Sequence, residues 1–114
     1  MMVTDTMLSQ KKCAPCTPGT EPIHPDTAKS LLIEVPGWEL AIEGRAIRRR
    51  FPFKDFMSAL AFVQKLAPIA EAEGHHPDIM LGWGYVECVF WTHSITGLHQ
   101  NDFIMASKIN ELAS

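Results

Sequence analysis

The sequence lacks three features that would assign it to a specialised class of protein. No run of about 18 uninterrupted apolar residues is present, so we expect no transmembrane helix. The first residues show no basic segment followed by an apolar run, so no secretory signal is predicted. Cysteine is scarce and odd in number, with three residues, which favours a reducing compartment over a disulfide-stapled secreted domain. These absences predict a soluble, cytoplasmic protein.

Positive charge is also scarce. The chain has 10 Lys and Arg residues against 13 Asp and Glu residues, a formal net charge of −3, whereas a nucleic-acid-binding face requires an excess of basic side chains. The one basic cluster, Arg45 with residues 48–50, is short, and we interpret it as the solvated side of a strand. We therefore expect no direct binding to nucleic acid or to a membrane.

Proline and glycine indicate where the folded domain begins. Residues 1–22 show no sustained apolar period, and residues 17–20 with Pro22 interrupt any regular element. We interpret residues 1–22 as a flexible N-terminal arm and residues 23–114 as a single domain. Cys13 and Cys16 form a CxxC pair within the arm, but no second pair and no immediate helix accompanies it, so we interpret the pair as structural or incidental.

Apolar periodicity predicts an α+β fold for the domain. Helical patterns occupy residues 24–33, 54–73 and 100–112, and Pro68 should kink the second of these helices. Alternating patterns predict strands at 38–43 and 46–51, and within 80–93 either two strands or one bulged strand. The order α-β-β-α-β-β-α predicts an antiparallel β-sheet with helices packed on one face.

Histidines gather after the second predicted helix. His75 and His76 are followed by Pro77, which disfavours helical backbone at His76, so both imidazoles should lie on a stiff turn. His93 lies at the end of a predicted strand and converges with them if that strand runs beside the turn. For each histidine taken singly, a solvated loop residue is the alternative. A metal site with Glu71 or Asp102 is a second alternative, although adjacent histidines on one turn are poorly placed to bind the same ion.

This segment resembles the signature of the pterin-4a-carbinolamine dehydratases, a family that includes the dimerisation cofactor of a homeodomain transcription factor. The residues that carry the resemblance are Glu71, His75, His76, Pro77, Trp83, His93 and Asp102. His99 departs from the pattern, because the family usually has Ser or Thr there. We expect this departure to remove a conventional helix N-cap, worth about 1 kcal/mol.

The resemblance implies a hydro-lyase that converts a 4a-hydroxytetrahydropterin into a quinonoid dihydropterin, in recycling of a tetrahydrobiopterin-type cofactor. Such a reaction needs an acid and a base near neutrality, for which imidazole is suited. His75 is implied as the proton donor to the leaving hydroxyl, with His93 as its partner and His76 on the ring side. The residues implied to bind substrate are Glu71, Pro77, Trp83 and Asp102.

Three of these residues have alternative interpretations. Glu71 either orients His75 or binds the pterin, or is a solvated carboxylate at a helix end. Asp102 either holds an imidazole tautomer or is simply favoured by a helix N-terminus. Trp83 either forms a wall of the pocket or belongs to the core.

The resemblance also bears on partners. It implies no metal and no cofactor, because the pterin is the substrate. A homodimer or homotetramer and a functional link to an aromatic amino acid hydroxylase are implied as well. The alternative function is a non-catalytic dimerisation or transcriptional coactivator module of the same fold.

Overall fold

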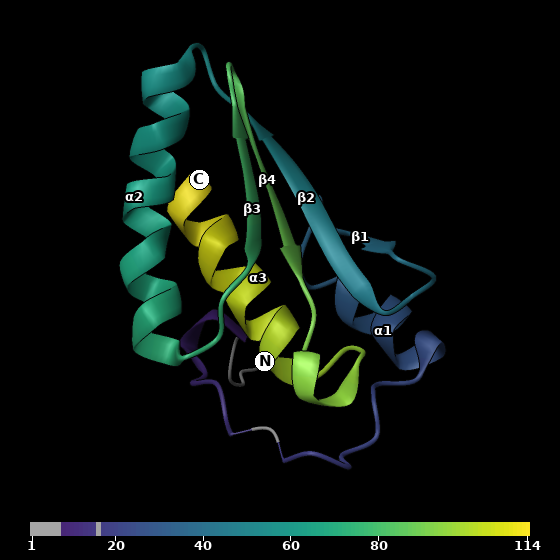
Figure 1. Cartoon of the computed structure of the whole chain (residues 1–114). Helices are drawn as coiled ribbons and strands as arrows, with labels where there is room; N and C mark the ends of the chain where they lie inside the picture. The colour runs from purple at the N-terminus through teal and green to yellow at the C-terminus, as the bar shows by residue number, and fades with distance from the viewer. Residues whose placement is uncertain (1–7, 16) are drawn as a thin grey trace, which may run out of the picture.

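Along the residues that the computed structural model describes, 8–15 and 17–114, three α-helices alternate with four β-strands (Figure 1). The elements in chain order are α1 (Pro25–Leu32), β1 (Glu39–Ala41), β2 (Ala46–Pro52), α2 (Phe56–Glu73), β3 (Asp78–Gly82), β4 (Tyr85–Phe90) and α3 (Gln100–Ala113), with short 3₁₀ helices η2 (Leu8–Gln10) and η3 (His93–Ile95). This element order confirms the predicted α+β class. No helix in these ranges is both long and apolar enough to cross a membrane.

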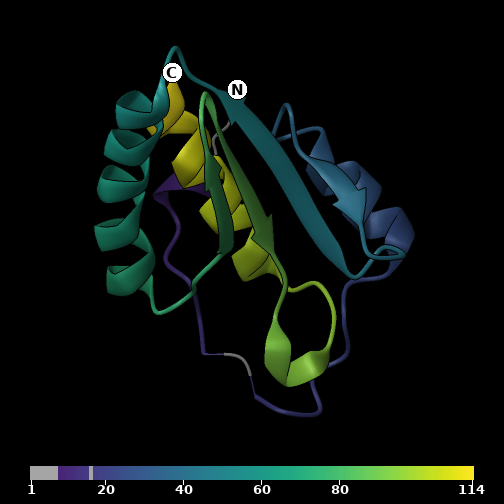
Figure 2. The same cartoon turned by 45° about the horizontal axis from the view of Figure 1, so that its top comes forward.

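The four strands form one antiparallel sheet in the order β1-β2-β4-β3. Of the two alternatives for residues 80–93, the structure shows two strands, because β3 and β4 form a hairpin that turns at Trp83 and Gly84. Gly84 has a φ of 82°, a left-handed conformation that glycine adopts without strain. Figures 1 and 2 show α2 and α3 side by side against the sheet.

The core lies between the sheet and these helices. Val86, Cys88 and Phe90 alternate along β4 and are fully buried, as their spacing predicts for the inward face of a strand. Ile47 on β2 pairs with Phe90, and Phe51 pairs with Val86, so the two central strands present one continuous apolar face. Helix α3 closes the core from the other side with a run of buried residues at 101–106.

Helix α2 ends in a way that positions the histidines. It begins at Phe56, after the side chain of Asp55 accepts a hydrogen bond from Ser58 N (2.8 Å), and Pro68 lies inside it without ending it. Gly74 follows in the left-handed conformation, with a φ of 65°, and stops the helix. The His75 amide then donates to the carbonyl of Ala70 (3.2 Å), which holds the turn against the last helical residues.

Part of the segment predicted as an arm is packed against α3. Leu8 is buried, and the ammonium group of Lys108 donates to the carbonyl of Ser9 (2.9 Å). The hydroxyl of Ser9 donates to the carboxylate of Glu111, further along the same helix (2.5 Å). Residues 8–10 are therefore attached to the domain, while the division into a flexible arm and a domain stays a prediction.

Candidate active site

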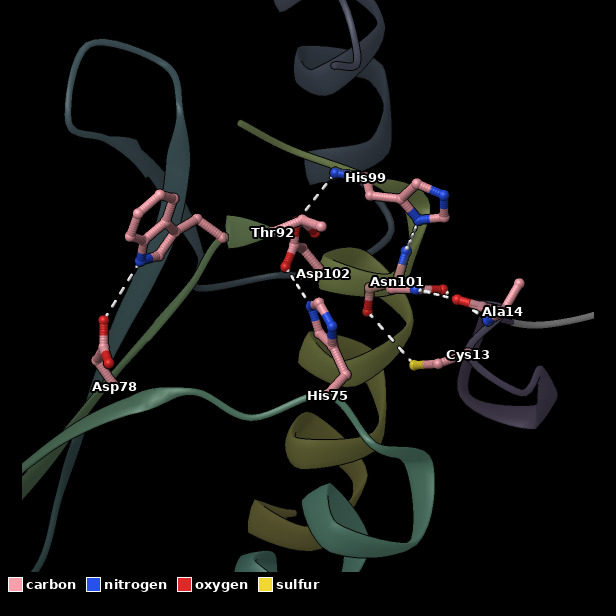
Figure 3. Close-up of polar contacts among 9 residues, drawn as sticks. Cys13, Ala14, His75, Asp78, Thr92, His99, Asn101 and Asp102 are labelled. Carbon is pink, nitrogen blue, oxygen red and sulfur yellow. Dashed lines mark hydrogen bonds and ion pairs between the residues drawn. The ribbon is translucent and has the colours of Figure 1, made fainter. Parts of the chain in front are cut away.

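A buried carboxylate behind His75 is the central feature of the site (Figure 3). Asp102 is 0% exposed, and its Oδ1 lies 2.6 Å from Nε2 of His75, whose side chain is itself only 12% exposed. A carboxylate has no proton to donate, so Nε2 of His75 is the donor. This bond fixes the tautomer of His75, and the ring also stacks on Phe90 with the two planes 7° apart.

The second oxygen of Asp102 is tied to the start of α3. Asp102 Oδ2 accepts hydrogen bonds from the Thr92 hydroxyl and from the backbone N–H of His99, both at 2.9 Å. The side chain of His99 also caps the helix, since its Nδ1 accepts a hydrogen bond from the backbone amide of Asn101 (3.0 Å). The two residues form a capping box at the N-terminus of α3. The expectation that His99 removes the helix cap is therefore wrong, since an imidazole nitrogen accepts the bond that a hydroxyl would otherwise accept.

His76 makes a different kind of pair. Its Nε2 lies 2.7 Å from Oε1 of Glu71, but the His76 and Glu71 side chains are 59% and 81% exposed. Water competes for both partners at such a site, and exposed ion pairs typically contribute between 0 and about 1 kcal/mol. Glu71 is thus placed to orient His76, not His75 as one interpretation of the sequence held.

His93 comes from the other side of the site, on η3. Its ring stacks on the indole of Trp91, with centroids 3.9 Å apart and planes 26° apart. Trp91 Nε1 in turn donates to Asp78 at the start of β3 (3.3 Å). His93 is exposed, so this stack is the contact that defines the orientation of its ring.

The three histidines surround one pocket of about 540 Å³. Its lining residues are Cys13, Ala14, Pro15, Glu73, Gly74, His75, His76, Trp91, Thr92, His93, Ser94 and Asn101. The structure therefore brings His75, His76 and His93 together, as their positions around the turn and the strand end suggested. A pocket of this size is in the usual range for a small-molecule site.

The other predicted site residues lie outside the lining of this pocket. Asp102 is behind His75 and fully buried, and Pro77 follows the histidine turn without reaching the pocket. Trp83 lies in the β3–β4 turn, at the far end of the hairpin from Asp78, and is 72% exposed. Within the described chain, Trp83 therefore belongs neither to the core nor to the wall of this pocket.

The N-terminal segment contributes to the pocket, which its sequence did not indicate. The Cys13 amide donates to Glu73 Oε1 (2.7 Å), and this bond is the main cause that holds the pKa of Glu73 below its ordinary value. Burial, together with the Glu73 carboxylate, raises the pKa of the Cys13 thiol to about 12. Cys13 is therefore a neutral thiol near neutral pH. In the sequence, the CxxC motif before the domain was the only feature that could have drawn attention to its place in the pocket.

The arrangement is suited to proton transfer. Nε2 of His75 and Nε2 of His76 are each paired with a carboxylate. In the part of the chain that the structure describes, no three His, Cys, Asp or Glu side chains are grouped as ligands for a metal ion. Two differently held imidazoles and an exposed third one offer an acid and a base around a single small-molecule pocket.

Comparison with known proteins supports one chemistry. Residues 21–112 match the family model described as pterin 4 alpha carbinolamine dehydratase. A protein of Methylococcus capsulatus, provisionally named a pterin-4-alpha-carbinolamine dehydratase, is 50% identical over 107 residues and covers 94% of each chain. A protein of Halorhodospira halophila with the same provisional name is 48% identical over 107 residues, covering 94% of this chain and 98% of the relative.

Solved structures agree with the fold. The crystal structure of a transcriptional coactivator/pterin dehydratase from Brucella melitensis superposes with a TM-score of 0.77 and 32% identity, covering 82% of this chain and 100% of that one. A pterin dehydratase-like protein identified as a RuBisCO assembly factor in the alpha-carboxysome has a TM-score of 0.59 at 24% identity, covering 68% and 90%. The second likeness concerns the fold alone.

Proposed function

This chain belongs to the pterin 4 alpha carbinolamine dehydratase family and is a hydro-lyase of that family, and we propose that it removes water from a 4a-hydroxytetrahydropterin by acid–base catalysis in its histidine pocket. In this reaction the bond between C4a and the hydroxyl oxygen breaks, and a proton joins the leaving oxygen. The adjacent ring nitrogen loses its proton, and a C4a=N double bond forms. The products are water and a quinonoid dihydropterin, so we propose that the enzyme uses no metal and no further cofactor.

His75 is the proposed proton donor, and its bond to Asp102 is the observation that carries this proposal. Asp102 occupies Nε2 of His75, so the proton transferred to the hydroxyl comes from Nδ1. As Nδ1 gains and loses a proton, the buried carboxylate stabilises the positively charged ring through a charge-assisted hydrogen bond, about twice as strong as a neutral one. Asp102 is in our proposal a positioning residue for His75 and does not touch the substrate.

His93 is the proposed partner that takes the proton from the ring nitrogen. It lines the same pocket as His75 but comes from η3, so the two imidazoles approach a bound ring from different elements. His76, exposed and paired with Glu71, is proposed to lie beside the pterin ring. Each acid–base group typically contributes a factor of about 10²–10⁴ to the rate.

The test is turnover of freshly generated carbinolamine by glutamine variants. His75→Gln retains an N–H donor for Asp102 but has no proton to give to the leaving hydroxyl. His93→Gln removes the imidazole that is proposed to take the proton from the ring nitrogen. We expect each to slow turnover by roughly 10²-fold or somewhat less, since the uncatalysed dehydration sets a floor. The double variant should lose less than the product of the two single losses, because both groups act on one step.

The matched control is His99→Asn. Asparagine retains the side-chain acceptor that caps α3, so the helix start is preserved and turnover should stay near that of the wild type. Alanine is unsuitable there, because it would remove the cap. Full activity in both His75→Gln and His93→Gln would contradict the assignment of the acid and the base.

A second candidate function is a non-catalytic binding module, because the Brucella melitensis relative is described as a transcriptional coactivator as well as a pterin dehydratase. The buried Asp102–His75 pair favours catalysis, since capping α3 uses only Oδ2 of Asp102, whereas Oδ1 is bonded to the imidazole that lines the pocket. Absence of turnover in the wild type would favour the module. We further propose a homodimer or homotetramer and a substrate supplied by an aromatic amino acid hydroxylase.

A further inference from the structure

We propose that Cys13, Ala14 and Pro15, here called the strap, form a substrate-binding wall of the pocket and that Asn101 is the residue that positions it. This inference rests on the proposed function, because it identifies the strap as a contact for the pterin ring. The strap lies outside residues 21–112 that match the family model. The curated relatives align over 94% of this chain, so the strap belongs to the region that they share with it although it precedes the matched domain.

Asn101 holds the strap with both ends of its amide group (Figure 3). Its Oδ1 accepts from the Ala14 amide (2.9 Å), and its Nδ2 donates to the Ala14 carbonyl (2.6 Å). Asn101 is only 3% exposed and lies in the first turn of α3, next to Asp102. The strap is thus fixed to the same helix end that holds the Asp102 carboxylate behind His75.

A third bond attaches the strap to α2. The Cys13 amide donates to Glu73 Oε1 (2.7 Å), and the Glu73 side chain, 12% exposed, also lies 4.0 Å from the ammonium group of Lys108. The strap therefore joins the C-terminal end of α2 to the N-terminal end of α3. Two backbone N–H groups and one carbonyl are bonded within two residues, which is the pattern of a fixed segment and not of a solvated loop.

The strap contributes three residues to the lining of the pocket that His75 and His93 also line. Ala14 and Pro15 have apolar side chains and are exposed, whereas Cys13 is a neutral thiol that donates to the carbonyl of Asn101 (3.9 Å). The polar imidazoles come from the histidine turn and η3, so the pocket has one reactive side and one unreactive side. A flat bicyclic ring held between the two sides would make polar contacts with the histidines and van der Waals contacts with the strap.

This geometry predicts an effect on substrate binding and little effect on the chemical step. The proton-transferring groups are on other elements, so loosening the strap should raise KM and leave kcat within about twofold. Two hydrogen bonds hold Ala14, and the net contribution typical of such bonds corresponds to a rise in KM of about 5- to 150-fold when both are lost.

The experiment breaks the bonds to Ala14 from each side. Asn101→Asp keeps an acceptor for the Ala14 amide but places a carboxylate oxygen against the Ala14 carbonyl, and an acidic residue is well tolerated at a helix N-terminus. Ala14→Pro removes the amide donor and leaves Asn101 unchanged. Asn110→Asp makes the same chemical change at the other end of α3, away from the pocket, and serves as the control.

Two measurements are made on each variant. Steady-state turnover separates KM from kcat. Hydrogen exchange, with and without 7,8-dihydrobiopterin, reports on the strap independently of turnover; it is followed at the Cys13 amide in every protein and at the Ala14 amide in all but Ala14→Pro, which has no N–H there. We expect both strap variants to raise KM and to exchange faster, while Asn110→Asp does neither. In the wild type, 7,8-dihydrobiopterin should slow exchange at these two amides at least about threefold.

The outcomes separate this inference from the proposed function. A wild type without turnover contradicts the proposed function, whereas slowed exchange with 7,8-dihydrobiopterin still supports the strap as a pterin contact. Faster exchange in Ala14→Pro with an unchanged KM would overturn the inference, because the strap would then be packed but unused. A raised KM in Asn101→Asp alone would also overturn it, because Asn101 itself would then be the binding group.

Discussion

Replacing Asp102 by Asn tests how the site controls the protonation of His75. Oδ2 accepts from the Thr92 hydroxyl, which can donate or accept, and from the His99 backbone N–H, which can only donate. The amide oxygen of Asn should therefore take that position, which directs the NH₂ group toward Nε2 of His75. His75 then has to accept at Nε2 and carry its proton on Nδ1, the opposite tautomer to that in the wild type.

The expected magnitude follows from the bond that is lost. A hydrogen bond to a charged group contributes about 1.5–3 kcal/mol. In the wild type the bond from His75 to the Asp102 carboxylate strengthens as the ring becomes positively charged. In the variant an amide N–H points at Nε2 instead and disfavours the positively charged ring. At about 1.4 kcal/mol per factor of ten, kcat should fall about 10- to 150-fold. KM should change little, because Asp102 is buried behind the pocket.

The assay combines stopped-flow turnover with ¹⁵N NMR of the His75 ring, which shows directly which nitrogen carries the proton. Glu71→Gln is the matched comparison, because it makes the same chemical change in an exposed pair with His76, and we expect it to cost less than about fivefold. If the spectrum shows the reversed tautomer of His75 while kcat is unchanged, the role assigned to Asp102 is refuted.

Three further predictions concern other parts of the molecule. The pKa of Glu73 is lowered by the Cys13 amide and, more weakly, by Lys108 and Lys12. The ionised Glu73 carboxylate therefore stabilises the folded state fully above the ordinary glutamate pKa of about 4.3, and this contribution is lost as pH falls through the lower pKa of the folded state. The urea-unfolding free energy should therefore fall more steeply from about pH 5 to pH 3 in the wild type than in Glu73→Gln, and equal slopes would contradict this. Burial raises the pKa of Cys13 and of Cys88 to about 12. In a Cys16→Ser background both thiols should therefore react slowly with a disulfide reagent at pH 8 until the protein is unfolded, and Cys13→Ser should leave kcat nearly unchanged, because the thiol takes no part in proton transfer. Light scattering at micromolar concentration should give the mass of a dimer or tetramer, and a monomer mass would count against that expectation.

The regular elements were predictable because short-range periodicity determines them. The helical pattern over 54–73 predicted the end of α2 at Glu73, and the alternating pattern within 80–93 includes β4, whose alternate residues from Val86 to Phe90 are buried. The boundary errors are small: α2 begins at Phe56, two residues after the predicted start. The formation of such helices and strands depends on residues a few positions apart, and these local patterns can be read from a single sequence.

The site was only partly predictable, because several of its contacts join residues far apart in sequence. The bond between Ala14 and Asn101 spans 87 residues, and that between His75 and Asp102 spans 27. Nothing in the local pattern of the N-terminal segment indicated the first of these. Trp83, which the resemblance implies as a substrate-binding residue, lies in the β3–β4 turn outside the lining of this pocket, and the hairpin turn that places it there is not evident from the signature.

The capping box at α3 has a consequence for how the enzyme fails. One carboxylate both caps this helix and holds the imidazole of His75. A transient unwinding of the first turn of α3 would therefore release the His75 ring, the proposed proton donor, from Asp102. Helix ends open far more often than whole domains unfold. Activity should therefore be lost reversibly on heating, at temperatures where circular dichroism still shows the native fold. The loss of activity would then report on unfolding of the first turn of α3 alone.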